Sequence, residues 1–213
     1  PMNNSHHLPP FTKALLDFAT EARDDFCTPG HHSGALFEEI PEGRAFVSAL
    51  GEGAFTADIS DSSSVIGDPS SHEGVSGEAE ALAASVYGSD RCFFVLGGTS
   101  ASNRIAISAL VSEGDLILFD RNNHKSASQA ALAAAGGLPV YLASERNESG
   151  IIGGLTEETL DPTRLREKAA RLSPAAAKKA RPFRLACLQL STYDGLFLNA
   201  KEIIRRIGPL CDY

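Results

Sequence analysis

Long apolar runs are absent from the sequence. None approaches the roughly 18 residues that a helix needs to cross a bilayer, which argues against a membrane protein. Basic residues are too few to favour a nucleic-acid partner, because 19 Lys and Arg stand against 27 Asp and Glu and give a net charge of -8. Residues 1–7 are polar and do not resemble a signal peptide. Apolar residues at 43% and charged residues at 22% are typical of soluble globular proteins, so collagen-like and disordered chains are excluded.

Cysteine is scarce and scattered. The four cysteines, Cys27, Cys92, Cys187 and Cys211, lie far apart and form no C-x-x-C pair. Three of them lie in or beside apolar runs, where a reduced cysteine behaves as a small hydrophobic residue. A disulfide framework needs more cysteine in a shorter chain. We therefore expect a reduced, cytoplasmic protein.

The 213 residues are enough for one domain or for part of a larger one. The chain opens on Pro1, before its only methionine, and closes on Leu-Cys-Asp-Tyr, which resembles the start of a strand. A parallel sheet that is cut inside a strand leaves apolar surface exposed. We therefore expect a chain truncated at Tyr213 that is unstable by itself.

The N-terminal third has little regular pattern. Residues 1–10 predict a linker or lead-in, and residues 11–75 predict an irregular segment that begins with a helix over 11–23. Residues 28–69 are rich in Gly, Pro, Ser and Asp. Such a long irregular stretch in a compact domain is usually functional or covered by a partner.

Residues 76–213 alternate regularly between helical and strand patterns. The predicted helices span 77–87, 99–111, 126–135, 163–172 and 200–207. The predicted strands span 91–96, 116–119, 139–142 and 183–190. Short apolar strands that alternate with amphipathic helices are typical of a parallel sheet. The sequence therefore predicts an α/β fold with a mainly parallel sheet and flanking helices.

The segment VLGGTSASN, residues 95–103, leads from a strand pattern through two glycines into a helix. A glycine such as Gly98 lets the backbone approach a ligand, and the free N–H groups of a helix start favour an anion. Thr99 and Ser100 could add hydroxyl donors, which makes a phosphate site possible. The segment lacks the lysine of a P-loop and the glycine spacing of a dinucleotide turn. The alternative is an ordinary turn that caps a helix.

The segment DRNNHKS, residues 120–126, directly follows a predicted strand. Ligands of open α/β sheets bind beyond the carboxyl ends of the strands, so polar residues there are functional candidates. His124 could act as a base or as a flat surface against a planar cofactor, and Lys125 could act as a nucleophile. The alternative is a solvated loop in which Ser126 caps the next helix.

Other polar motifs carry weaker signals. The neighbouring histidines His31 and His32 do not converge easily on one ion, and no H-E-x-x-H or Cys/His spacing occurs, so no metal site is expected. The segment STYDG, residues 191–195, follows the last predicted strand and places Thr192 and Asp194 at its carboxyl end. A simple turn is the alternative there.

Seven motifs occur in one order along the chain: TPGHHSG, DPSSHEG, AEALAASVYGSDRCFFVLGGTSASN, DRNNHKS, GGLPVYL, NESGIIGG and STYDGLFLNAKEI. In order and wording they resemble the bacterial ornithine/lysine/arginine decarboxylases that depend on pyridoxal 5'-phosphate (PLP). The resemblance covers about residues 11–213. LGGTSASN, the Asn-Asn before His124, and RPFRLACLQLSTYDG are most similar to the ornithine branch.

The resemblance implies the fold of aspartate aminotransferase, with residues 76–213 as the first part of its large, PLP-binding domain. It implies that Gly98, Thr99 and Ser100 hold the cofactor phosphate and that His124 stacks on the pyridine ring.

By the same resemblance, His31, Thr192 and Asp194 lie in the vicinity of the active site. The resemblance also implies that Lys125 is not the Schiff-base lysine. That lysine, like the aspartate that pairs with the ring nitrogen, belongs to a later motif that this sequence does not contain.

The implied activity is PLP-dependent decarboxylation of a small cationic amino acid, first of all ornithine to putrescine and carbon dioxide, in polyamine metabolism or acid response. The cofactor serves as an electron sink when the carboxylate leaves. The implied assembly is a homodimer or a higher homo-oligomer. Alternatives are a lysine or arginine decarboxylase, another PLP enzyme of the same fold, and a non-catalytic homologue without the lysine. The 213 residues alone are expected to be inactive.

Overall fold

A computed structural model describes residues 8–21, 26, 28–60 and 66–213 of the chain. These residues fall into two compact units, which are divided between Phe94 and Val95. The division lies later in the chain than the change from irregular to regular sequence pattern at residue 76. Most of the predicted lead-in, residues 1–7, lies outside the described residues, as does Cys27.

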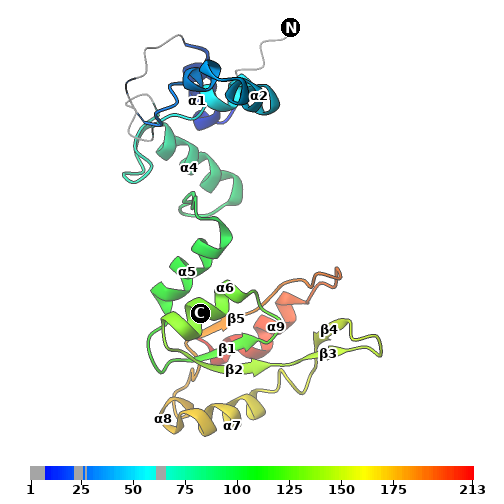
Figure 1. Ribbon diagram of the computed structural model, residues 1–213. Coiled ribbons are helices and arrows are strands. Elements are labelled where there is room, and N and C mark those ends of the chain that lie inside the picture. Colours follow the sequence, from blue (N-terminus) through cyan, green and yellow to red (C-terminus); the bar gives the residue numbers. More distant parts are fainter. Residues whose placement is uncertain (1–7, 22–25, 27, 61–65) are drawn as a thin grey trace. The chain divides into compact units, whose positions relative to one another are not determined.

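The N-terminal unit is helical. Its elements are α1 (Pro10–Thr20), the 3-10 helix η2 (Ala35–Glu39), α2 (Pro41–Leu50), α3 (Glu52–Thr56) and α4 (Gly74–Tyr87) (Figure 1). Helix α1 confirms the predicted helix over 11–20 but ends there, since Glu21 is extended; residues 22 and 23 lie outside the described residues. The prediction that 28–69 is irregular is wrong, because η2, α2 and α3 lie within it.

The helices η2, α2 and α3 were not predicted because they are short and are held together by one aromatic cluster. Helix α2 begins at Pro41, whose fixed φ suits a first helical position. The rings of Phe37, Phe46 and Phe55 lie 5.3 to 5.6 Å apart, centroid to centroid. Gly43 allows α2 to approach η2, since a Cβ there would lie 2.1 Å from the Phe37 carbonyl oxygen. Helices of 5 to 10 residues that share such a cluster show little periodicity in sequence.

Helix α4 confirms the predicted alanine-rich helix and begins three residues earlier than expected. It ends at Gly88, which has a left-handed φ of 65°. The carboxylate of Glu80 is nearly buried, pairs with His72 Nδ1 at 3.0 Å and accepts the Phe94 N–H at 3.1 Å.

The predicted strand over 91–96 is wrong. Residues 91–95 have no strand assignment, and among the described residues no strand lies beside them. The Phe94 N–H bonds a side-chain carboxylate instead of a neighbouring strand. Phe93 and Phe94 are about half exposed, so the apolar run that predicted a buried strand is not buried here.

The C-terminal unit contains a three-stranded parallel sheet. Strands β1 (Leu116–Asp120), β2 (Leu138–Leu142) and β5 (Leu185–Cys187) lie in the order β2-β1-β5 (Figure 1). Leu118 lies opposite Val140 on one side and Ala186 on the other. The predicted α/β class with a parallel sheet is confirmed, although β5 is shorter than the predicted strand over 183–190.

Helices cover both faces of this sheet. They are α5 (Gly98–Leu110), α6 (Lys125–Ser128) with the following π-helical turn η3 (Gln129–Ala134), α7 (Pro162–Leu172), α8 (Pro174–Ala177), α9 (Ala200–Ile207) and the 3-10 turn η4 (Gly208–Leu210). The helices predicted over 99–111, 126–135, 163–172 and 200–207 are thereby confirmed.

Strand β1 divides its side chains between two cores. Leu116 and Leu118 pack with α7, α9 and β2, whereas Ile117 and Phe119 pack with α5, α6 and η3. Alternate residues of a strand face opposite sides of the sheet, so a strand covered on both faces must be apolar throughout. This explains the uninterrupted LILF run, each residue of which is almost fully buried.

Two further features complete the unit. The last residues, Cys211 to Tyr213, run parallel to the β5 segment: Asp212 N–H donates to Phe183 O at 3.0 Å, and Ala186 N–H donates to Tyr213 O at 2.9 Å. The antiparallel pair β3 (Ser144–Arg146) and β4 (Ile152–Leu155) was not predicted. Each strand is only three or four residues long, too short for a clear alternating pattern.

Among the described residues, no helix combines the length and the apolar character needed to span a bilayer.

Leu165→Ala should destabilise the C-terminal unit strongly. The Leu165 side chain is fully buried beneath the sheet, so its truncation leaves a cavity that costs about 2–5 kcal/mol. Leu172→Ala is the matched control on α7, since Leu172 is 47% exposed and its loss should cost about 0.5 kcal/mol or less. Hydrogen-exchange protection of the β1 amides measures both effects. Equal losses in the two variants would contradict this packing.

Candidate functional site

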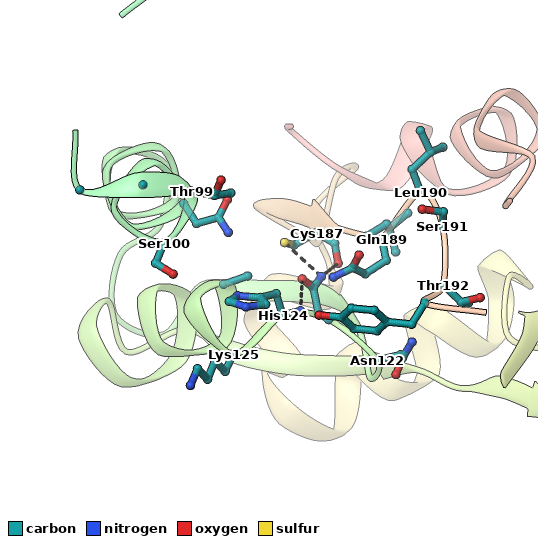
Figure 2. Close-up of a pocket in the computed structure, with 17 residues that line it drawn as sticks. Thr99, Ser100, Asn122, His124, Lys125, Cys187, Gln189, Leu190, Ser191 and Thr192 are labelled. Atoms are coloured by element: carbon teal, nitrogen blue, oxygen red, sulfur yellow. Dashed lines mark hydrogen bonds between the residues drawn. The ribbon is translucent and has the colours of Figure 1, made fainter. Parts of the chain in front are cut away.

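A pocket of about 990 Å³ lies in the C-terminal unit, at the carboxyl ends of β1 and β5 (Figure 2). Three segments line it: the start of α5 from Gly97 to Ser100, the loop 122–125 after β1, and residues 187–193 from the end of β5 onward. This is the edge at which open α/β sheets bind ligands. The volume falls in the range of small-molecule and cofactor sites, about 300–1,000 Å³.

The start of α5 offers free backbone donors to the pocket from Thr99 onward, whereas the Gly98 N–H donates to the Val95 carbonyl oxygen at 3.2 Å. Its N-cap residue, Gly97, makes no side-chain cap hydrogen bond, and the first turn contains no acidic residue. Gly98 has a φ of +74°, which glycine adopts without strain, and a Cβ there would meet nothing within 4 Å. Uncapped N–H groups at the positive end of a helix dipole bind anions. With the hydroxyls of Thr99 and Ser100 beside them, these donors have the chemistry that an anion requires.

The two loops of the pocket are tied together through buried groups. Asp120 ends β1 with its carboxylate almost fully buried, and this carboxylate accepts the N–H of Asn122 at 2.9 Å and that of Gln189 at 3.4 Å. Asn123 Nδ2–H donates to the Cys187 carbonyl oxygen at 3.0 Å, while its Oδ1 accepts the His124 N–H at 2.9 Å. The exits of β1 and β5 are therefore held in one fixed relation.

The imidazole of His124 is held at its Nδ1 by Ser126. Its Nδ1 accepts the backbone N–H of Ser126 at 3.2 Å and lies 2.8 Å from the Ser126 hydroxyl oxygen. That oxygen in turn accepts a hydrogen bond from Asn103 Nδ2 at 2.8 Å. A ring nitrogen that accepts a backbone N–H carries no proton, so neutral His124 carries its proton on Nε2. His124 itself is exposed within the pocket.

Most of the predicted site residues meet in this one pocket. Gly98, Thr99, Ser100, His124 and Thr192 all line it. Figure 2 shows His124 between the Thr99 and Ser100 side of the pocket and the side formed by Gln189 and Thr192.

Three other candidates lie differently. The side chain of Lys125 lines the pocket and in Figure 2 extends away from His124. Asp194 is exposed in the neighbouring turn, closed by a hydrogen bond from the Gly195 N–H to Thr192 O, and does not line the pocket. His31 lies in the N-terminal unit, with its Nε2 3.1 Å from Asp58 Oδ2. The roles of Asp194 and His31 stay predictions.

The lining residues that were not predicted as site residues include Asn103, Asn123, Cys187 and Gln189. Asn103 comes four residues after Thr99 and so shares its face of α5, a signal available in the sequence. Cys187 and Gln189 lie inside the predicted strand 183–190 and were therefore read as strand residues. The observed strand β5 ends at Cys187, which places both residues at its carboxyl end.

Neither a metal nor a reactive thiol is indicated in the pocket. Among the residues that the structure describes, no group of three or more His, Cys, Asp or Glu side chains could hold a metal ion. Burial raises the pKa of the Cys187 thiol, the hydrogen bond from Asn123 offsets part of this shift, and the charge of Asp120 adds to it. At neutral pH the thiol is therefore protonated and a poor nucleophile.

Comparison with known proteins identifies relatives along nearly the whole chain. The family described as Orn/Lys/Arg decarboxylase, major domain, matches residues 9–213. An inducible ornithine decarboxylase of Lactobacillus sp. (strain 30a) is 50% identical over 206 residues, and one of Escherichia coli (strain K12) is 46% identical over 205 residues. These matches cover 97% and 96% of this chain and 28% of each relative. Lysine and arginine decarboxylases match at 36 to 38% identity.

Solved structures agree in fold. Lysine decarboxylase A from Pseudomonas aeruginosa superposes with a TM-score of 0.85 at 37% identity, over 98% of this chain and 28% of that one. The chain thus spans a little over a quarter of the length of the relatives it matches. With the family match over residues 9–213 and the parallel sheet of the same fold, the chain belongs to the ornithine/lysine/arginine decarboxylase family.

Proposed function

We propose that these residues form the phosphate- and ring-binding part of a PLP site in a decarboxylase of basic amino acids. The observation that carries the proposal is the meeting, in one pocket, of an uncapped, glycine-led helix start with an exposed histidine whose ring is fixed from behind. The first suits a phosphate dianion, and the second suits the face of an aromatic ring.

The donor set fits this cofactor. The phosphate would be held at the start of α5 by the backbone N–H groups that follow Gly98 and by the hydroxyls of Thr99 and Ser100. The carboxylate of Asp120, which could repel an anion, is almost fully buried and engaged with backbone N–H groups. When bound, PLP supplies an electron sink for the electron pair that remains after loss of carbon dioxide.

The chain's own residues act by orientation. His124 would stack on one face of the pyridine ring, and the start of α5 would bind the phosphate group of the cofactor. Two such attachments restrict rotation of the ring, which favours the geometry in which the breaking bond lies perpendicular to the ring plane. The tie between the β1 and β5 loops keeps the walls of the pocket from moving apart.

We further propose ornithine as the substrate, decarboxylated to putrescine. Relatives named ornithine decarboxylases are 42 to 50% identical to this chain, above those named for lysine or arginine. The family resemblance assigns the covalently bound lysine to a motif that the 213 residues do not contain, so the proposal concerns the full-length protein. That protein would work in the cytoplasm as a homodimer or higher homo-oligomer.

Ser100→Ala should weaken PLP binding by the full-length protein. The loss of one hydrogen bond to a charged group corresponds to about 1.5–3 kcal/mol, or roughly 10- to 100-fold in the dissociation constant. Ser102→Ala is the matched control, because the Ser102 hydroxyl bonds the Gly98 carbonyl of its own helix and does not line the pocket. Absorbance titration of the apoprotein measures both. An unchanged dissociation constant in Ser100→Ala would refute the phosphate role.

His124→Ala should reduce turnover of ornithine roughly 2- to 10-fold, the range that corresponds to one aromatic contact. His124→Phe should recover part of the loss, since it restores a flat face without the ring nitrogens. Release of carbon dioxide from ornithine measures turnover. Wild-type activity in His124→Ala would remove the stacking claim.

Borohydride reduction of the full-length protein with PLP, followed by peptide mapping, tests the whole assignment. The label is expected on a lysine outside these 213 residues. A label on Lys125 would show that the site is mapped wrongly, and the absence of any label would favour a non-catalytic homologue.

A further inference from the structure

We propose that Ser126 and Asn103 are positioning residues that act on the cofactor through His124. The proposal rests on the function proposed above and adds two residues to which the motif comparison assigns no role in the cofactor site. They form a relay in which Asn103 Nδ2–H donates to Ser126 Oγ, which lies 2.8 Å from His124 Nδ1.

The relay has a definite direction at the histidine. The Ser126 N–H donates to His124 Nδ1 at 3.2 Å. If Nδ1 carried a proton, its N–H and the Ser126 N–H would be two donors facing each other, and no hydrogen bond could form. Nδ1 is therefore the acceptor, and the Ser126 hydroxyl, which receives the Asn103 amide on its lone pair, is free to donate its own proton to the ring. His124 keeps one tautomer, with Nε2–H as the donor that remains.

The Ser126 side of the His124 ring is buried, whereas the ring itself is exposed. Ser126 is 1% exposed, and Asn103 is partly buried, whereas His124 is exposed in the pocket. A buried hydroxyl that is fully engaged with its partners has little freedom to rotate. The imidazole therefore combines a fixed rear edge with a free surface, which is what a ring-stacking residue requires.

The relay also joins the two ends of the proposed cofactor site. Asn103 lies four residues after Thr99 on α5, and Ser126 lies in the first turn of α6. The helix that would bind the phosphate thus contacts, through one amide, the residue that sets the ring of His124. Asn103 and Ser126 would fix the distance from the phosphate donors to the stacking surface.

Ser126→Ala in the full-length protein tests this role, because it removes the hydroxyl and keeps the backbone N–H. PLP affinity and the visible circular dichroism of bound PLP are measured in the wild-type background and in the His124→Ala background. Ser126→Ala should raise the PLP dissociation constant roughly 3- to 10-fold in the first, as expected for one lost hydrogen bond. In the second the change should be less than about 2-fold, because a residue that acts only through His124 has nothing left to act on.

Ser128→Ala is the matched control, since Ser128 lies two residues further on the same helix, is partly buried, and has its hydroxyl outside the relay. It should leave affinity and dichroism unchanged. Asn103→Ala serves as a second variant: its effect should be non-additive with that of Ser126→Ala, and it keeps the test decisive if Ser126→Ala impairs folding.

Equal effects of Ser126→Ala in the two backgrounds would overturn the inference and assign Ser126 a purely structural role. No effect in the wild-type background would also overturn it. If the wild-type protein binds no PLP, the proposed function itself fails, an outcome that the unmutated protein reveals before any variant is made.

Discussion

The pocket depends on how strand β1 ends. Four apolar residues of β1 are buried between two helical layers, and the fifth, Asp120, buries a carboxylate at the edge of the sheet. A buried charge must be matched by donors, and here the donors are backbone N–H groups of the loops after β1 and β5. That requirement brings the loop after β1, which contains His124, and the segment after β5, which contains Thr192, to the same edge of the sheet, where both line the pocket.

The part of this arrangement that the sequence predicts is local. A short continuous apolar run such as LILF, between turn signals and amphipathic segments, is typical of a strand covered on both faces, and those segments provide the covering helices. Because parallel strands end at one edge, the polar residues that follow them had to meet there. This is why His124 and Thr192, which follow β1 and β5, could be predicted at the same edge, whereas Gly98 and Ser100 follow no strand in the described residues and were assigned to the site by the family resemblance.

What could not be predicted depends on contacts between distant residues. The bond from Asn123 to Cys187 joins residues 64 positions apart, and no local pattern in the sequence indicates it. The helices within residues 28–60 are held by aromatic packing among Phe37, Phe46 and Phe55, not by a periodic apolar face. The apolar run 91–96 resembles a strand in composition, but composition does not show whether a partner strand lies beside it.

The central claim is that one pocket of this chain binds the phosphate and one face of PLP. A density map of the full-length protein purified with PLP tests it most directly. The account predicts the phosphate within hydrogen-bond distance of the backbone and hydroxyls of residues 98–100, with the His124 imidazole against the pyridine ring. A phosphate bound elsewhere, or a ring that does not touch His124, would contradict it.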